Sequence, residues 1–108
     1  MDKDKRHQPR IKLKQTISAA DDSTMFLIDI IDISAEGICF TSEVEYKKGD
    51  RVYLVFPGNE QIKENELEAS VWRCEPTGNS TKLFKVTAVF VDANLKYLYD
   101  INKLNEET

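Results

Sequence analysis

The chain alternates between apolar and polar residues in six short segments, most of them followed by residues that favour turns. In the segment 51–56, Val52, Leu54 and Phe56 share one side, and Pro57-Gly58-Asn59 ends the run. The pattern predicts strands over 11–19, 25–33, 38–42, 51–56, 67–74 and 83–90. Segment 25–33 is apolar on both faces, so we expect a strand that is covered on both sides. Six short strands at this spacing favour a mainly β fold, an antiparallel barrel whose closure leaves no exposed edge.

The last part of the chain has the period of a helix. Tyr97, Leu98, Ile101 and Leu104 form one apolar stripe, and Asp92 is placed to cap the helix. A helix this short is marginal alone in water, so the stripe is expected to dock on the barrel or on a partner. With 108 residues, 41% of them hydrophobic, the chain suffices for one domain with one core. We divide it into a flexible basic arm, 1–9, and a barrel with its helix, 10–108.

No segment has the features of a secretion signal or a membrane span. The longest apolar run, 25–33, is interrupted by Asp29 and Asp32, and no apolar segment follows the basic start of the chain. Cys39 and Cys74 are too few for a disulfide scaffold, so both are expected to be reduced. We therefore expect a cytoplasmic protein that does not insert into membranes.

Charge is distributed unevenly along the chain. Residues 1–14 carry six Lys or Arg against two Asp, a balance of +4, whereas the remainder carries nine cations against seventeen anions, a balance of −8. An acidic body repels long polyanions, so binding to DNA or RNA is not expected. A small anion with one or two phosphates can still bind beside the basic arm, which is otherwise a solvated tail.

Residues suited to catalysis are scarce. The single histidine, His7, lies in the arm, where nothing orients it as a base for a serine or cysteine nucleophile. One histidine and two isolated cysteines do not make a zinc site, and no Gly-rich phosphate loop is present. We expect no enzyme, no cofactor and no metal.

The first of two informative clusters is Arg6-His7-Gln8-Pro9-Arg10, in which three residues separate two arginines just before the first strand. A guanidinium pairs bidentately with phosphate or with the O6/N7 edge of guanine, and it also stacks on bases. Pro9 stiffens the link, so Arg10 is expected to be anchored at the strand while Arg6 moves with the arm.

The second cluster is Asp32-Ile33-Ser34-Ala35-Glu36-Gly37, at the end of the most apolar strand. Asp and Ser bond the backbone in turns, and Gly supplies positive φ, so a turn alone explains the cluster. In the alternative interpretation, Asp32 accepts hydrogen bonds from the N–H groups of a purine. Ser34 then adds a hydroxyl, and Gly37 lets a ligand approach the backbone. Both interpretations stay open on the residues themselves.

Together the clusters resemble the PilZ domain family, whose motifs are Arg-x-x-x-Arg and Asp/Asn-x-Ser-x-x-Gly. Their order, the spacing of twenty-two residues from Arg10 to Asp32, and the apolar strand before the second motif make the combination specific. The resemblance covers most of the chain, since Val71-Trp72-Arg73 and the segment 84–90 match an Arg-ending strand and the aromatic-rich final strand of the family. It implies a six-stranded (split) barrel with a C-terminal helix that binds cyclic di-GMP.

The resemblance also implies a role for each matched residue. The arginines hold phosphates and guanine faces, the Asp and Ser read a guanine edge, the Gly permits contact, and a lysine beside the first arginine adds a cation. The residues so assigned are Lys5, Arg6, Arg10, Asp32, Ser34 and Gly37. The family usually has glycine where this chain has Thr87, and we expect a local packing change there without loss of binding.

Trp72 and Arg73 are further candidates for the ligand site. Trp72 falls on the polar face of its strand, beside Ser70, where an exposed indole can stack on a base. Equally, the C-terminal helix can cover it.

The resulting hypothesis is a single-domain adaptor that binds cyclic di-GMP and relays the signal to an effector protein. In this hypothesis the basic arm folds over the ligand when it binds. Two alternatives stay open: a PilZ-like interaction module that binds no nucleotide, and a small oligonucleotide-binding barrel that uses Trp72 and the arm.

Overall fold

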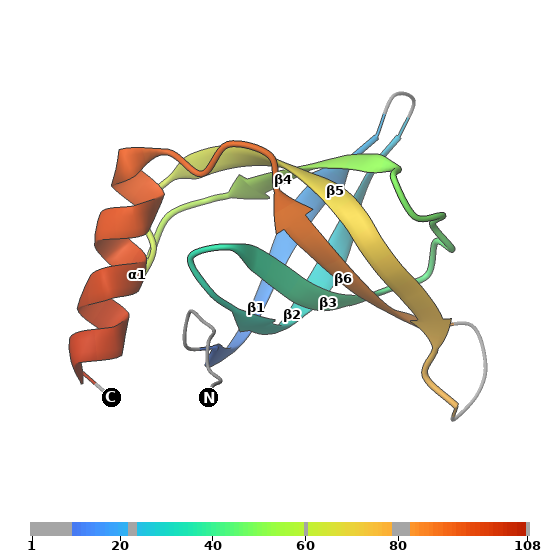
Figure 1. Cartoon of the computed structure of the whole chain (residues 1–108), viewed down its shortest axis with the longest axis horizontal. Helices are drawn as coiled ribbons and strands as arrows, with labels where there is room; N and C mark the ends of the chain where they lie inside the picture. The colour runs from blue at the N-terminus through green and yellow to red at the C-terminus, as the bar shows by residue number, and fades with distance from the viewer. Residues whose placement is uncertain (1–9, 22–23, 60, 79–82, 108) are drawn as a thin grey trace, which may run out of the picture.

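The barrel and its helix are seen in a computed structural model that describes residues 10–21, 24–59, 61–78 and 83–107. The elements are β1 (Ile11–Ala20), β2 (Met25–Ile33), β3 (Gly37–Ser42), β4 (Arg51–Phe56), β5 (Asn65–Pro76), β6 (Phe84–Phe90) and α1 (Leu95–Glu107). The strands close into a barrel in the order β1-β2-β3-β6-β5-β4, and every neighbouring pair is antiparallel (Figure 1). The predicted mainly β fold, a six-stranded antiparallel barrel with a C-terminal helix, is confirmed.

The core is built from the alternating residues of all six strands. Val52, Leu54 and Phe56 of β4 are at most 1% exposed, whereas Arg51 and Tyr53, on the opposite face of the strand, are exposed. A strand places successive side chains on opposite faces, so one apolar residue in two is enough to fill the barrel. Within the described part of the chain, no helix has the length and apolar character needed to cross a membrane.

One prediction about β2 is wrong. The strand is apolar on both faces, but only its inner face is covered throughout, since Met25 is 65% exposed and Leu27 is 70% exposed. Both are opposite small residues of β1, in the pairs Leu27↔Ser18 and Met25↔Ala20. A strand of a small barrel has one neighbouring layer, the core, and α1 is docked elsewhere.

Helix α1 stands at one end of the barrel (Figure 1). Its cap is Asn94, whose Oδ1 accepts the Tyr97 backbone N–H at 2.9 Å, so the prediction of Asp92 as the cap is wrong by two residues. The Tyr97 ring is fully buried, with its centroid 6.1 Å from that of Phe56 and 5.0 Å from that of Phe90. The predicted apolar stripe therefore docks on the barrel.

Local irregularities alter the strand register near the candidate site. The pairing shifts by one residue between Ile30 and Asp32 of β2, and again between Val71 and Arg73 of β5. A bulge of this kind turns two consecutive side chains outward or re-aims one. In β5 it exposes both Trp72 and Arg73, whereas strict alternation would direct only one of them to solvent.

Candidate ligand-binding face

Arg10 and Asp32 meet on the outside of the barrel. Residue 10 directly precedes β1, and Asp32 lies near the end of β2, opposite Lys12 in the pairing of the two strands. The Arg10 Nη1 lies 2.5 Å from the Asp32 Oδ1, with the Arg10 side chain 50% exposed and the Asp32 side chain 19% exposed. One residue of each sequence motif thus meets the other on one surface of the barrel, although the two are twenty-two positions apart.

A row of paired residues extends from this ion pair across the barrel, and its central member, Cys39, is only 4% exposed. The pairings Lys12↔Asp32, Asp32↔Cys39, Cys39↔Thr87 and Thr87↔Arg73 place five residues in line on β1, β2, β3, β6 and β5. Directly opposite residues share one face of a sheet, so these side chains form one surface, which we call the outer row. From Asp32 to Arg73 it spans three strand spacings, roughly 14 Å along the sheet.

The turn after Asp32 is fixed by Ser34. This residue is 3% exposed, and its Oγ accepts the backbone N–H groups of Glu36 at 3.1 Å and Gly37 at 3.2 Å. Its backbone carbonyl accepts the Tyr97 hydroxyl of α1 at 2.7 Å. The hydroxyl that the resemblance assigns to a guanine edge thus bonds the backbone of the turn in this structure, and its contact with a ligand remains a prediction.

Gly37 is required by packing. The glycines with positive φ are Gly49, Gly58 and Gly78, so a left-handed backbone does not explain Gly37. A Cβ at this position would lie 2.3 Å from the Ala88 carbonyl oxygen of β6, a contact that backbone atoms cannot relieve cheaply. Close approach of β3 and β6 thus excludes any side chain here. A role of Gly37 in ligand contact remains a prediction.

Cys39 is the neutral centre of the outer row. Burial is the main cause that raises the pKa of its thiol, and the nearby Asp32 carboxylate raises it further. The hydrogen bond from Thr87 Oγ1, 3.8 Å from the sulfur, and the charges of Lys85 and Arg10 act in the opposite direction. The thiol is therefore protonated at neutral pH. Both cysteines are free, as the sequence predicts.

Trp72 and Arg73 lie at the β5 end of this face. Trp72 is 54% exposed, and the Lys48 Nζ lies 4.2 Å from the centre of its ring. The helix does not cover this indole, so of the two alternatives for Trp72 the exposed one holds. The Arg73 side chain is 64% exposed, and its Nη1 lies 3.9 Å from the Glu75 Oε2.

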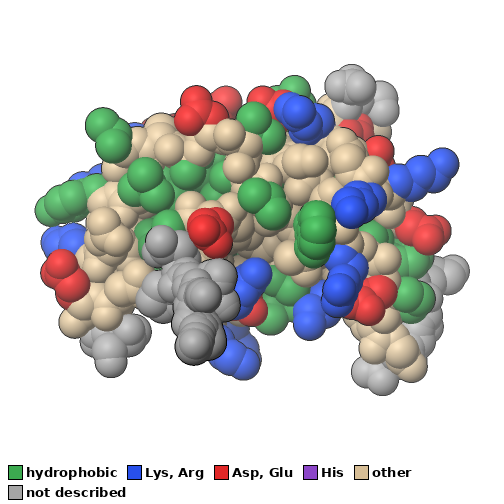
Figure 2. Space-filling view, viewed as in Figure 1, with side chains coloured by type: hydrophobic (Ala, Val, Ile, Leu, Met, Phe, Trp, Pro, Cys, Tyr) green, Lys and Arg blue, Asp and Glu red, His purple; other side chains and the backbone are tan. Residues whose placement is uncertain are grey.

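The face has positive charge around it although the body of the protein is acidic. Lys and Arg side chains gather where Figure 1 shows β3, β5 and β6 (Figure 2). Lys12 and Lys85, both exposed, were not predicted from the sequence as site residues. Only the strand register reveals them, because it places Lys12 opposite Asp32 and Lys85 two pairs along from Thr87, on the same face of β6. Lys5 and Arg6, like the rest of the predicted arm, lie outside the described residues.

A family model for the PilZ domain matches residues 4–101. The chain belongs to the PilZ domain family. No curated protein sequence matches it.

Solved structures share the PilZ fold of this chain. The complex of MrkH from K. pneumonia with c-di-GMP has a TM-score of 0.71 at 18% identity, over 96% of this chain and 52% of that one. The Bacillus subtilis inhibitor of motility (MotI/DgrA) has a TM-score of 0.71 at 18% identity, over 96% and 53%. The PilZ domain of YcgR from Escherichia coli with c-di-GMP has a TM-score of 0.67 at 14% identity, over 96% and 94%. This chain therefore spans about half the length of the first two proteins.

Proposed function

We propose that this PilZ domain binds cyclic di-GMP on the outer row and relays the signal to a partner protein as an adaptor. The observation that carries the proposal is the ion pair between Arg10 and Asp32, in which the two motif halves meet on one exposed surface. The similar folds of MrkH and the YcgR PilZ domain, both solved with c-di-GMP, support the choice of ligand.

The ion pair holds the groups that a guanine nucleotide needs. A guanidinium donates to phosphate oxygens or to the O6/N7 edge of guanine, and a carboxylate accepts from the N–H groups on the opposite edge. Without ligand, Arg10 and Asp32 neutralise each other across 2.5 Å. A dianionic ligand offers each of them a new partner, so binding exchanges one charged contact for several.

The remaining motif residues act through the turn and the arm. Ser34 fixes the turn that presents Asp32, and Gly37 lets β3 approach β6 directly behind it. In the proposal Lys5 and Arg6 add cations from the arm, which folds over the bound ligand. The ordering of such a segment costs part of the binding free energy and gives the partner a new surface to recognise.

At the far end of the face, Trp72 and Arg73 contact the second half of the ligand in the proposed complex. An exposed indole stacks on a base at about 1–3 kcal/mol. Trp72 also provides a direct probe, because the sequence contains one tryptophan. The proposed function is that of a receptor, with no catalytic step and no cofactor.

Titration of the ¹⁵N-labelled domain with cyclic di-GMP tests the proposal. We expect amide shifts at Arg10, Asp32 and Thr87, and a change in Trp72 fluorescence at the same ligand concentrations. GMP at equal concentration is the control, since it offers one base and one phosphate. An unchanged spectrum at millimolar cyclic di-GMP would contradict the proposal and favour the interaction module that binds no nucleotide.

The salt dependence of the affinity distinguishes the oligonucleotide-binding alternative from the proposed function. Single-stranded DNA bound through many phosphate contacts loses affinity steeply as salt rises. We expect no shift with a dT oligonucleotide at 150 mM salt, since the body of the domain is acidic.

A further inference from the structure

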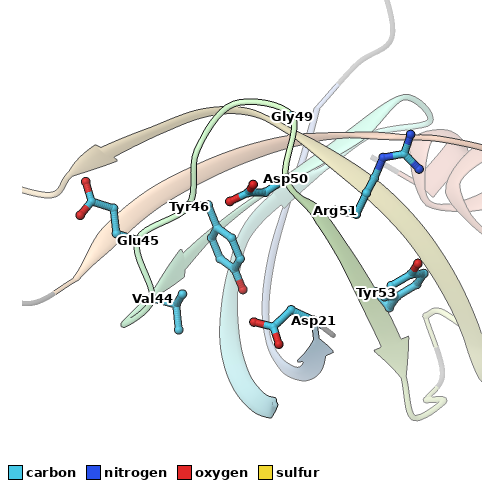
Figure 3. A pocket seen from close by; sticks show the side chains of 8 residues that line it. All are labelled: Asp21, Val44, Glu45, Tyr46, Gly49, Asp50, Arg51 and Tyr53. Carbon is cyan, nitrogen blue, oxygen red and sulfur yellow. The ribbon is translucent and has the colours of Figure 1, made fainter. Parts of the chain in front are cut away.

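The outer row continues past β5 into the β3–β4 loop, residues 43–50. The Gly49 N–H donates to the Val71 carbonyl at 2.8 Å, and the Val71 N–H donates to the Asp50 carbonyl at 2.8 Å. In Figure 3 Gly49 lies near the crest of this loop, beside the ribbon of β5. The pairing of β4 with β5 therefore extends into the residues that precede β4, and Lys48 is the next residue along the loop.

Lys48 lies on the ring of Trp72. Its Nζ is 4.2 Å from the ring centroid, a distance at which the π electrons of an indole attract an ammonium. The bulge of β5 between Val71 and Arg73 brings the indole to the surface next to Arg73. The ring is 54% exposed in spite of the lysine, so the exposed part remains available to a base.

No acid opposes the charge of Lys48. Its side chain is exposed, and in the parts of the chain that the structure describes no carboxylate forms an ion pair with it. Arg73, the other cation at this end of the face, has the Glu75 Oε2 3.9 Å from its Nη1. The ammonium of Lys48 is therefore the more readily available to an anion.

The backbone that carries Lys48 is fixed by a tight turn. The Asp50 N–H donates to the Lys47 carbonyl at 3.0 Å, and the Lys47 N–H donates to the Asp50 Oδ2 at 2.8 Å. Gly49 has a φ of 96°, the left-handed value that a type II turn requires at its third residue. The long, flexible stem of lysine can thus move its ammonium from the ring to a nearby group while the loop stays in place.

Lys48 and Asp32 mark opposite ends of the face. Four strand spacings separate them, roughly 19 Å along the sheet. One nucleotide does not span this distance, whereas a ligand with two bases and two phosphates extends along most of it. The body of the protein is acidic and repels such a dianion, so a cation near each end of the face offsets the repulsion.

We propose that Lys48 is a further ligand-binding residue, which exchanges the Trp72 ring for a phosphate oxygen when cyclic di-GMP binds. This role rests on the proposed function, and Lys48 lies outside both sequence motifs. With ligand present, a guanine stacks on the indole and the ammonium donates to the neighbouring phosphate. A full negative charge attracts an ammonium more strongly than an aromatic ring does, so the exchange is favourable.

Calorimetric titration of wild type and Lys48→Met with cyclic di-GMP tests this role. Methionine retains an unbranched apolar stem that can cover the indole, and it lacks the charge. We expect K48M to bind about tenfold more weakly, because one charge-assisted contact is lost. K47M is the matched control, since it loses the same charge from the neighbouring exposed position, and it should bind within about twofold of wild type.

Two further measurements separate a charged contact from a structural role. K48R keeps a cation that both contacts rings and pairs with phosphate, so its affinity should lie within about threefold of wild type. The deficit of K48M should shrink as salt rises from about 0.05 M to about 0.5 M, because salt screens the contact that K48M lacks. An equal deficit in K48M and K48R that does not change with salt would overturn the role of the charge.

The exchange of partners is visible at the ε-CH₂ protons of Lys48. Without ligand they lie over the indole, whose ring current should move their NMR resonances upfield, and Trp72→Leu should abolish this shift. Saturation with cyclic di-GMP should return the resonances of wild type toward the values of an unstacked lysine. Resonances that stay unchanged in the saturated complex would overturn the exchange.

Failure of this role is distinguishable from failure of the proposed function. No binding of cyclic di-GMP by wild type would contradict the proposed function, and the role of Lys48 with it. Binding by wild type with equal affinity in K48M would overturn the role of Lys48 alone and leave the proposed contacts of Arg10 and Asp32 in place.

Discussion

At the scale of single residues, the Asp32 carboxylate takes part in two different interactions, one without ligand and one in the proposed complex. Without ligand it neutralises Arg10, and in the proposed complex it accepts hydrogen bonds from a guanine edge. Because its side chain is still 19% exposed, a ligand reaches it without rearrangement of the barrel. The affinity for cyclic di-GMP should therefore depend on this carboxylate more than on any other in the strand.

Asp32→Asn tests that dependence. We expect the affinity to fall roughly 5- to 150-fold, from the about 1–3 kcal/mol of a bidentate contact to a base. Asp29→Asn is the matched control on the same strand, where the carboxylate accepts the Thr16 hydroxyl at 2.6 Å. Calorimetric titration of both variants gives the comparison, and equal loss in the two would contradict a specific role for Asp32.

At the scale of elements, the motif turn and helix α1 form one unit. The Tyr97 hydroxyl donates to the Ser34 carbonyl, and the Tyr97 ring packs between Phe56 and Phe90. The turn that carries half of the candidate site is thereby tied to the far end of the chain.

Tyr97→Phe should lower the free energy of unfolding by about 1 kcal/mol, because it removes this buried hydrogen bond and retains the ring. Tyr99→Phe removes a hydroxyl from a 58% exposed ring of the same helix and should leave stability unchanged. Urea unfolding at pH 7 measures both. If Y97F and Y99F unfold at the same urea concentration, the hydrogen bond contributes nothing to holding the turn on the helix.

The sequence predicts the elements well and their outer surfaces poorly. Alternation reveals which residues of β4 and β6 face inward, because side-chain direction follows a period of two. A bulge shifts the alternation of inward and outward side chains by one residue, and no pattern in the neighbouring sequence marks it. The pairing of Arg73 with Thr87 could therefore not be predicted. Exposure of Leu27 depends on what packs outside the barrel, and no local pattern encodes it.

The candidate site was predicted in part for the same reason. Arg10 and Asp32 were predicted as site residues from their chemistry and from the resemblance to the PilZ family, and the structure brings the two side chains into contact. Ser34 was matched by its motif, but its hydroxyl is used inside the turn, which depends on backbone geometry. Lys12 and Lys85 were not predicted, because only the strand register places them beside Asp32 and Thr87.

At the scale of the whole molecule, one buried thiol and two buried phenols make the stability of the fold sensitive to alkaline pH. Burial raises the pKa of Cys39 above its ordinary value of 9.0, and those of Tyr46 and Tyr97 above 10.0. Above those values the unfolded chain loses protons that the folded chain keeps. Stability is therefore full below about pH 9 and falls as pH rises, by up to about 1.4 kcal/mol per pH unit for each group.

Urea unfolding between pH 7.5 and 10.5 measures this slope. The double variant Y46F/Y97F should show a smaller decrease in the free energy of unfolding above pH 9.5 than wild type, even though its stability at pH 7 also differs. An identical slope in the two proteins would contradict the assignment of alkaline sensitivity to these phenols.

In the proposed complex, Arg6 and Arg10 hold cyclic di-GMP together with Asp32. Calorimetric titration of wild type, R6A/R10A and K96A/K103A with this ligand tests this arrangement most directly, because both double variants lose two positive charges and the second loses them from exposed positions of α1. We predict binding by wild type and K96A/K103A and no detectable binding by R6A/R10A. Tight binding retained by R6A/R10A would contradict the account.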